Sequence, residues 1–264
     1  MTTATIKQIF IHPVKGLTPQ PLDRAILQEG HGIPGDRAFA LMYDEGKTDS
    51  EDETVPWLKK QHFAMQSDWP GLAGLECHYD AETATLRVRR QGVELLAAAT
   101  NHPTGRQQIG TFFTGYLAAL HPLPTARHPD RAPLRLVGGS PHTRYPDRNA
   151  VHLSLMSQAT LDAITAWMGC PVDVRRFRPN LVIDGVEAWE EFTWVGREVR
   201  LGEARLAITA PIGRCPNIDI NPDTGERDLL LFDALYPNVQ HRNTGVLATV
   251  VTGGNIAIGD FIIT

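Results

Sequence analysis

The sequence predicts a mostly β protein of the α+β class, built as two lobes with peripheral helices. Three observations support this prediction. Short alternating or apolar runs recur between glycine-containing turns, two segments show helical periodicity, and a stretch rich in Pro, His and Arg separates two such regions. With 264 residues, 42% of them hydrophobic, the chain is long enough for one large or two ordinary domains. The pattern favours a barrel or closed sheet over a βαβ array.

Residues 1–125 are expected to form the first lobe, a β-barrel-like domain. The segments TIKQIFIHPV and RAILQEGHGIPGDRAFALMY predict strands joined by a glycine-rich turn. The segment LECHYDAETATLRVRR, residues 75–90, alternates apolar and polar residues on both sides of a turn and predicts a hairpin. In GRQQIGTFFTGYLAAL, residues 105–120, apolar residues recur at helical spacing. This helix is expected to close the first lobe.

Residues 126–264 are expected to form the second domain, with 121–150 as the connection. SQATLDAITAWMGC predicts a helix with Ser157 as N-cap, ended by Gly169 and Pro171. Strands are predicted in VRRFRPNLVIDG, in TWVGREVRLGEARLAITA and in TGVLATVVTGGNIAIGDFIIT.

Composition and motif content exclude several classes of protein. A net charge of −5 argues against a general nucleic-acid binder. The sequence has no 18-residue apolar run and no signal-peptide pattern, so the chain is expected neither to span a membrane nor to be secreted. Its three cysteines match neither a disulfide framework nor a CxxC pair, which indicates a reducing compartment. A cytoplasmic location is therefore expected. No GxxxxGK[ST], GxGxxG, HExxH or GxSxG motif occurs. Four of the ten histidines lie in His-Pro pairs and are interpreted as turn or loop residues rather than metal ligands.

The acidic segment 44–54, DEGKTDSEDET, is free of apolar residues. It is interpreted as a solvated mobile loop, with a docking patch for a basic electron-donor protein as the alternative.

Two cationic regions are candidates for a phosphate site. In DVRRFRPNLVID a strand would place Arg176 and Arg178 on one face, with Arg178 and Asn180 near the start of a long strand. Guanidinium groups match phosphate geometry, and an amide offers both donor and acceptor to a heterocycle. In the first lobe, Lys15 and Arg37 stand beside glycines that allow close approach of a ligand. The alternative is that these cations are surface charges or members of ion pairs.

Cys215, in the segment APIGRCPNIDINPDTG, has several interpretations. It could be a small buried hydrophobe, a nucleophile or a metal ligand. The neighbouring Arg214 favours the thiolate, and no cysteines or histidines stand close enough in sequence for a structural zinc site. A remaining option is a single thiolate ligand to a metal whose other ligands come from a bound cofactor.

An ordered set of motifs resembles a known family. RRFRPNLVIDG, the Trp in EEFTWVG, RCPNIDINPDTGERD and the terminal GNIAIGD resemble the MOSC domain, named for the C-terminal part of molybdenum cofactor sulfurase. IFIHPVKG and GIPGDRAFAL resemble the β-barrel domain that precedes MOSC in the mitochondrial amidoxime-reducing component and its bacterial relatives. The resemblance covers nearly the whole chain and implies an N-terminal barrel lobe followed by a MOSC β-barrel.

The resemblance also implies a molybdenum-pterin cofactor at the junction of the lobes, and pyridoxal phosphate is not expected. Cys215 matches the metal-ligating cysteine, and is therefore the expected catalytic residue. The expected cofactor-binding residues are Lys15 and Arg37 on the phosphate, and Ser154, Arg178, Asn180 and Arg214 from the MOSC side. Two positions depart from the family pattern. Gly16 follows Lys15 where relatives often have Ser or Thr, and Phe192 stands where many have an acidic residue, two before Trp194 and just after Glu190 and Glu191.

The activity implied is reduction of N-hydroxylated small molecules such as amidoximes, hydroxamic acids and N-hydroxylated bases. Electrons are expected from a separate donor protein, a ferredoxin, flavoprotein reductase or cytochrome, because the chain ends at Thr264 without a ferredoxin-like domain. The alternatives are a sulfur carrier that bears a persulfide on Cys215 and a protein that binds or handles the cofactor without catalysis. No nucleic acid or membrane partner is expected.

Overall fold

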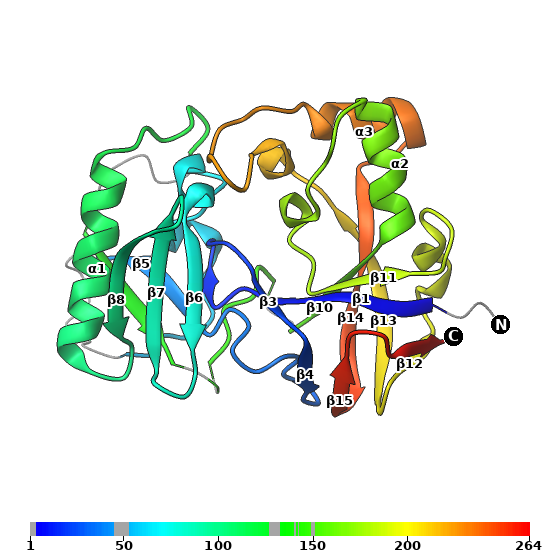
Figure 1. The fold of residues 1–264 in the computed structure, drawn as a ribbon, viewed down its shortest axis with the longest axis horizontal. Coiled ribbons are helices and arrows are strands. Elements are labelled where there is room, and N and C mark those ends of the chain that lie inside the picture. The colour runs from blue at the N-terminus through cyan, green and yellow to red at the C-terminus, as the bar shows by residue number, and fades with distance from the viewer. Residues whose placement is uncertain (1–3, 45–52, 127–132, 140, 142, 149–150) are drawn as a thin grey trace.

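The computed structural model describes residues 4–44, 53–126, 133–139, 141, 143–148 and 151–264. Figure 1 shows two lobes side by side, one around helix α1 (Pro103–Ala118) and one around a barrel with helices α2 (Gln158–Met168) and α3 (Leu231–Val239) at its upper end. Most of the acidic segment 44–54 lies outside the described residues, so its interpretation as a loop stays a prediction. No helix of the described part is both long and apolar enough to span a membrane.

The second lobe is built on a closed barrel, as predicted. Its seven strands pair in the order β11, β10, β14, β13, β12, β16 and β1, and a β1–β11 pairing closes the ring. Only the β10–β11 pair is parallel. The bounds are β1 Ala4–Ile11, β10 Leu153–Ser157, β11 Leu181–Asp184, β12 Glu198–Leu201, β13 Ala204–Gly213, β14 Asn243–Thr252 and β16 Phe261–Ile263.

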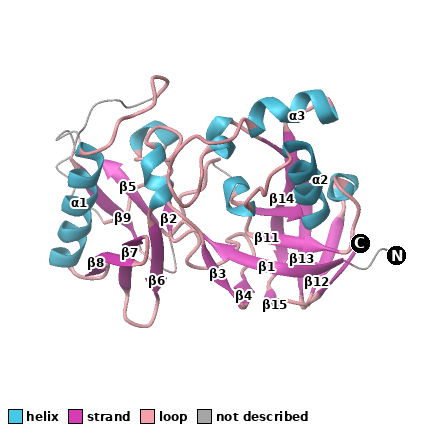
Figure 2. Ribbon diagram, turned by 45° about the horizontal axis from the view of Figure 1, so that its top comes forward, coloured by secondary structure: helices cyan, strands magenta, loops and turns pink. Residues whose placement is uncertain are grey.

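Alternating burial explains the barrel core. In β12 and the first part of β13, buried and less buried residues alternate, as expected for strands with one face inward. Strand β3 (Gln20–Leu22) extends the sheet from β1, and β4 (Arg24–Leu27) pairs with β15 (Gly254–Ala257) below the barrel. In Figure 2 the helices lie around the barrel rather than between its strands.

The first lobe contains two three-stranded sheets and helix α1. One sheet has the order β2 (Val14–Lys15), β5 (Phe39–Tyr43) and β9 (Leu134–Gly138), and the other has β6 (Glu76–Asp80), β7 (Thr85–Arg90) and β8 (Val93–Ala99). The predicted hairpin 75–90 is confirmed, with Cys77 opposite Val88 and Tyr79 opposite Leu86. The helix expected at 105–120 is confirmed as α1, whose residues Ile109, Phe113 and Leu117 enter the core of this lobe.

Strand pairing crosses the predicted domain boundary near residue 125 in both directions. Strand β1 comes from the start of the chain yet pairs with β11 and β16 in the barrel. Strand β9 follows the boundary yet pairs with β5 of the first lobe. The domain boundary at 125/126 stays a prediction. Each lobe, however, contains a strand from the other side of that boundary.

One strand prediction is corrected. Residues Val174–Phe177 form a 3-10 helix, because Asp173 caps it through the Arg175 amide and Arg178 ends it in a left-handed conformation with φ 53°. The strand begins only at Leu181. The strands within 24–43 do not pair with each other, since β4 joins β15 and β5 joins β2 and β9.

The second predicted helix is confirmed as α2. Ser157 is its N-cap, accepting a hydrogen bond from the Thr160 amide at 3.1 Å, and Gly169 ends it with φ 65°. Helix α3 was not predicted from sequence, because Pro237 lies inside it and is typical of helix interruption.

The side chains of Thr18 and Gln20 cover the free edge of β6. The Thr18 hydroxyl donates to the Leu75 carbonyl at 2.6 Å and accepts from the Cys77 amide at 3.0 Å. The Gln20 amide group donates to the Tyr79 carbonyl at 3.2 Å and accepts from the Tyr79 amide at 2.8 Å. These bonds replace a neighbouring strand and satisfy backbone groups that would otherwise be buried without partners.

Candidate functional site

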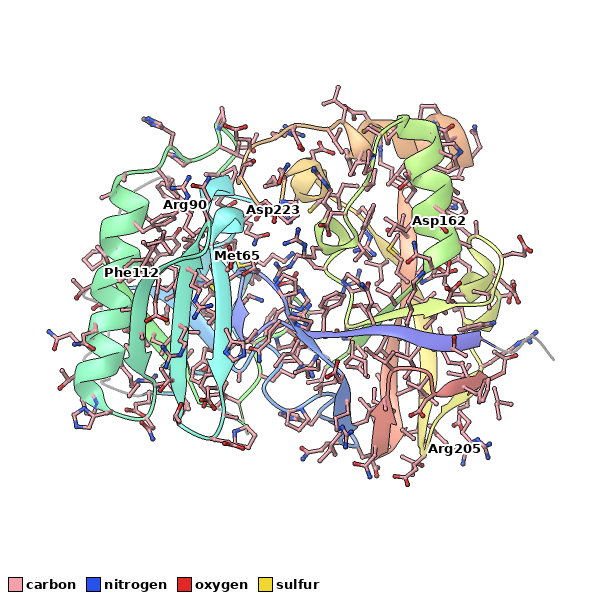
Figure 3. All side chains as sticks on the ribbon, in the orientation of Figure 1. Met65, Arg90, Phe112, Asp162, Arg205 and Asp223 are labelled. Carbon is pink, nitrogen blue, oxygen red and sulfur yellow. The ribbon has the colours of Figure 1, made fainter. Side chains whose placement is uncertain are left out.

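A cavity of about 450 Å³ lies at the junction of the two lobes. The first lobe contributes Gly16, Arg37 and Lys60 together with Met65, which Figure 3 labels between the lobes. The barrel side contributes the start of β10, the turn before β11 and the end of β13. The cavity therefore needs both lobes for its walls.

Basic side chains dominate the lining of this cavity. They are Arg37, Lys60, Arg144, Arg148, Arg176, Arg178 and Arg214, while Asp147 is the one carboxylate among the lining residues that the structure describes. The chain as a whole carries a net charge of −5. The local excess of positive charge therefore indicates a site for an anionic ligand.

Cys215 lies on this cavity at the end of β13. It is exposed, whereas Cys77 is buried and Cys170 is intermediate in exposure. Its backbone is extended, with φ −126° and ψ 167°, and Pro216 begins the short 3-10 helix η5 (Pro216–Asp219) directly after it. The interpretation of Cys215 as a buried hydrophobe is therefore wrong, and the thiol is available to a ligand.

Arg214 is anchored beside Cys215 by neutral oxygens. Its guanidinium donates to the Phe177 carbonyl at 2.8 Å, to the Thr244 hydroxyl at 2.5 Å and to the Thr244 carbonyl. Burial lowers the pKa of Arg214 to about 10, against the opposing effects of Cys215 and Glu191. Among the described residues no carboxylate forms an ion pair with this guanidinium.

Arg178, like Arg214, has no ion-pair partner among the described residues. Its guanidinium donates to the Leu17 carbonyl at 2.5 Å and reaches the Gln66 side-chain oxygen at 3.4 Å. Burial and the nearby Arg37 lower the pKa of Arg178 to about 10. Burying two guanidinium groups beside one cavity costs free energy unless an anion binds in that cavity and offsets their charge.

Arg37 belongs instead to an ion-pair network in which two guanidinium groups share one carboxylate. It contacts the carboxylate of Asp36, which also accepts from Arg144 at 2.8 Å and from the His12 amide at 2.8 Å. Burial would raise the pKa of Asp36, but Arg37 and Arg144 hold it well below its ordinary value. The predicted local pair of Asp36 and Arg37 is confirmed, and Arg37 still lines the cavity.

His12 lies in the loop between β1 and β2, and its side chain is fully buried. Burial, together with Arg178 and Arg37, lowers its pKa to about 3, so the imidazole is neutral at pH 7.

Lys15 does not line the cavity, although the sequence predicted a direct contact with phosphate. Its buried ammonium donates to the carbonyls of Tyr145 and Pro146, each at 3.0 Å, and to the Asp147 carboxylate at 2.8 Å. Lys60 contacts the other oxygen of Asp147 at 2.8 Å. The three ammonium protons of Lys15 thus hold the backbone of the segment that forms one wall, and its phosphate contact stays a prediction.

Ser154 and Asn180 both line the cavity and are bonded to each other. The Asn180 side-chain oxygen accepts from the Ser154 amide at 3.2 Å and from its hydroxyl at 3.1 Å, while the Asn180 side-chain nitrogen donates to the Phe10 carbonyl at 3.1 Å. These bonds tie β1, β10 and β11 together. The predicted heterocycle contact of Asn180 stays a prediction, with one amide hydrogen left for it.

Several cavity residues were missed by sequence reasoning. Arg144, Asp147 and Arg148 lie in a segment interpreted only as a connection, and the charge alternation in TRYPDR was the available signal. Asn217 lines the cavity two residues after Cys215, within the segment that carried the cysteine. Glu191 is fully buried under α2 and lies outside the lining residues; burial raises its pKa.

The donor set fits an anionic cofactor that brings its own metal. Among the described residues no group of three or more His, Cys, Asp or Glu side chains could hold a metal ion. Cys215 offers one soft ligand, and Arg178 and Arg214 offer positive charge that lacks a carboxylate within the described protein. A metal at Cys215 would therefore need further ligands from a bound group.

The chain matches two family models and several curated proteins. Mitochondrial amidoxime-reducing component 1 of Xenopus laevis is 36% identical over 81 residues, 31% of this chain and 22% of that protein. Its counterpart in Danio rerio is 29% identical over 125 residues, 45% of this chain and 37% of that protein. Molybdenum cofactor sulfurase of Oryza sativa subsp. japonica is 41% identical over 56 residues, 21% of this chain and 7% of that protein.

The match thus spans less than a quarter of the length of the Xenopus protein. A crystal structure of the YUAD protein from Bacillus subtilis aligns over 98% of this chain and 94% of that chain, with a TM-score of 0.43 and 13% identity. The MOSC N-terminal beta barrel domain model matches residues 3–119, and the MOSC domain model matches residues 142–263. The chain is therefore a MOSC protein, in which a MOSC N-terminal beta barrel domain precedes a MOSC domain.

Proposed function

We propose that this chain binds a molybdenum-pterin cofactor in the cavity between its lobes and reduces N-hydroxylated small molecules. One observation carries the proposal: the exposed thiol of Cys215 shares a cavity with Arg178 and Arg214, two guanidinium groups that no described carboxylate neutralises. A soft ligand beside a desolvated anion site matches a metal cofactor that carries a phosphate.

Different residues would bind different parts of such a cofactor. Cys215 would ligate the metal through its sulfur. Arg37 and Arg178 would contact the phosphate, and Lys15 would act by fixing the backbone at 145–147. When bound, the cofactor supplies a redox-active metal that can accept an oxygen atom from the substrate.

The net reaction balances with two electrons and two protons. An amidoxime R–C(NH2)=N–OH loses its N–O bond and leaves as the amidine R–C(NH2)=NH, with one water as the second product. A separate electron-donor protein provides the electrons, and solvent that enters the open cavity provides the protons. The protein's own part is to orient the N-hydroxyl group beside Cys215 and to limit access at the metal.

The comparisons support this choice of substrate. Proteins named amidoxime-reducing component share up to 36% identity with segments of this chain. The name of those proteins states the reaction type, and the cofactor proposed here is one that can perform it.

A sulfur carrier is the second candidate, and the exposure of Cys215 is the observation that favours it. A persulfide needs an accessible thiol, and molybdenum cofactor sulfurase is among the similar proteins. A carrier does not need two unneutralised guanidinium groups around its thiol. The charge of the cavity therefore favours the reductase.

Metal analysis separates the two candidates. Protein purified from a host that makes the cofactor is expected to contain near-equimolar molybdenum and pterin, and Cys215→Ala is expected to lose the metal. Cys170→Ala is the matched control, because it removes a thiol remote from the site and should retain the metal. Folded wild-type protein without either component, or a cyanide-labile sulfur on Cys215, would replace the reductase with the sulfur carrier.

A further inference from the structure

A second, much smaller cavity lies directly behind the wall of the main one. Its volume is about 10 Å³, close to the space that one water molecule needs. Gln66, Arg176, Arg178 and Asn217 line both cavities. The lining of the small cavity is mixed, and these four polar or charged side chains lie between it and the main cavity.

Two buried atoms of opposite hydrogen-bonding type belong to this wall. The side-chain oxygen of Asn217, an acceptor, and the Nε of Arg176, a donor, are both buried and lack partners among the described residues. The other nitrogens of Arg176 are occupied: Nη1 donates to the Asp219 carbonyl at 3.0 Å, and Nη2 donates to the Asp228 carboxylate at 2.7 Å. Leaving both atoms unpaired would cost free energy, and one water that accepts from Nε and donates to the oxygen would satisfy both.

The backbone that carries Asn217 is firmly held. The Asp219 carboxylate, in the same 3-10 helix η5, accepts from the Phe232 amide at 2.9 Å and pairs with Arg227 at 2.7 Å. The Ile218 amide donates to the Cys215 carbonyl at 3.2 Å. The backbone position of Asn217 relative to Cys215 is thus held, whereas its side-chain oxygen has no partner among the described residues.

We propose that a buried water in the small cavity fixes the Asn217 amide and makes Asn217 a specificity-determining residue of the site. With its oxygen held by the water, the amide presents its NH2 group to the main cavity, two residues from Cys215. There it donates a hydrogen bond to an acceptor on the substrate, the oxygen or nitrogen of the N-hydroxyl group. This role rests on the proposed function, and it selects neutral compounds that carry an acceptor at the bond to be broken.

Asn217→Leu tests the contact, because it keeps the approximate volume and removes the amide. For molybdenum-loaded protein with benzamidoxime as the probe, KM is expected to rise roughly threefold to tenfold with kcat little changed, as for loss of one neutral hydrogen bond. Asn238→Leu is the matched control, since Asn238 is exposed on α3 and bonds only to the Ala234 carbonyl at 2.7 Å among the described contacts. Rates are normalised to molybdenum content, which both variants should retain.

A high-resolution crystal structure provides the readout that does not depend on activity. Wild-type protein should show one ordered water within hydrogen-bond distance of Arg176 Nε and the Asn217 side-chain oxygen, and Asn217→Leu should lack it. An empty small cavity in the wild type overturns the proposal. Unchanged KM in Asn217→Leu overturns it while the proposed function stands, and loaded wild-type protein without any benzamidoxime reduction overturns both.

Discussion

The two walls of the cavity treat positive charge differently. On the wall formed by the first lobe and the segment 144–148, four cations share two carboxylates: Asp36 pairs with Arg37 and Arg144, and Asp147 pairs with Lys15 and Lys60. On the barrel wall, Arg176 pairs with Asp228, whereas Arg178 and Arg214 contact carbonyl, amide or hydroxyl oxygens and no described carboxylate pairs with them.

This difference separates cations whose ion pairs stabilise the fold from cations that are available to bind an anionic ligand. A neutralised, buried pair contributes to folding only while both partners remain. An unneutralised guanidinium contributes little to folding and much to anion binding. Substitutions on the two walls should therefore affect stability and binding in opposite proportions.

Asp36→Asn is expected to give the largest loss of stability. It leaves Arg37 and Arg144 without their shared carboxylate in a fully buried position, so the free energy of unfolding should fall by about 3–5 kcal/mol. Chemical denaturation of cofactor-free protein measures this. Asp184→Asn, at a half-exposed ion pair with Lys7, is the control and should change little.

Lys15→Met should have the next largest effect on stability. It removes the donor to the Tyr145 carbonyl and the ion pair with Asp147, while the Trp57 indole still donates to the Pro146 carbonyl at 3.1 Å, which predicts a loss of about 2–3 kcal/mol. Lys7→Met is the control, because Lys7 is partly exposed and pairs only with Asp184 among the described residues. Stability equal to that of the wild type would show that Lys15 does not hold this wall.

Arg178→Met is expected to change the unfolding free energy of cofactor-free protein by no more than about 1 kcal/mol, since the lost bond to the Leu17 carbonyl is offset by removal of a buried charge that no described carboxylate pairs with. Its effect should appear in ligand binding. Inorganic phosphate should raise the melting temperature of the wild type by mass action, and most of that shift should vanish in the variant. Arg205→Met, which removes an exposed arginine of β12–β13, should keep the shift. An Arg178→Met variant that retains the phosphate-induced shift in melting temperature would contradict the contrast between the two walls.

Sequence patterns predicted the local parts of this fold and missed the non-local ones. Helices α1 and α2 and the 75–90 hairpin were predictable, because periodicity, caps and turn residues lie within each segment. The exchange of β1 and β9 between the lobes was not, since pairing partners lie far apart in sequence. The 3-10 helix at 174–177 was predicted as a strand because it belongs to the longer segment VRRFRPNLVIDG, in which only Leu181–Asp184 forms a strand.

The site divides in the same way. Cys215, Arg178 and Arg214 were identified through a resemblance to a family, and the structure brings them to one cavity. Which cations are neutralised depends on the position of Asp147, whose partners Lys15 and Lys60 are far from it in sequence. The candidate residues could therefore be predicted from the sequence. Only tertiary contacts show that Lys15 holds the backbone of the cavity wall while Arg178 is available to a ligand.

Asp147→Asn should have the smallest effect on stability and the clearest pH dependence. Burial would raise the pKa of Asp147, but Lys15 and Lys60 hold it below its ordinary value. A carboxyl group with a lowered folded-state pKa stabilises the protein above its unfolded pKa of about 4, and this stability is lost as the pH falls through the folded value. Because the side chain is half exposed, the difference between wild type and variant at pH 7 should be at most about 1 kcal/mol.

Denaturation of both proteins across the acid range gives the difference directly. The gap between them should be present at pH 7, should narrow below about pH 4 as the unfolded state binds a proton, and should close as the pH falls through the lowered folded-state pKa of Asp147. In the same variant, phosphate should bind more tightly, since Lys60 and Lys15 lose their internal counter-ion while Arg178 is untouched. Tighter phosphate binding in Asp147→Asn with weaker binding in Arg178→Met would assign opposite roles to the two walls. A pH-independent gap would mean that Asp147 does not neutralise the lysines, and the contrast would then rest on Asp36 alone.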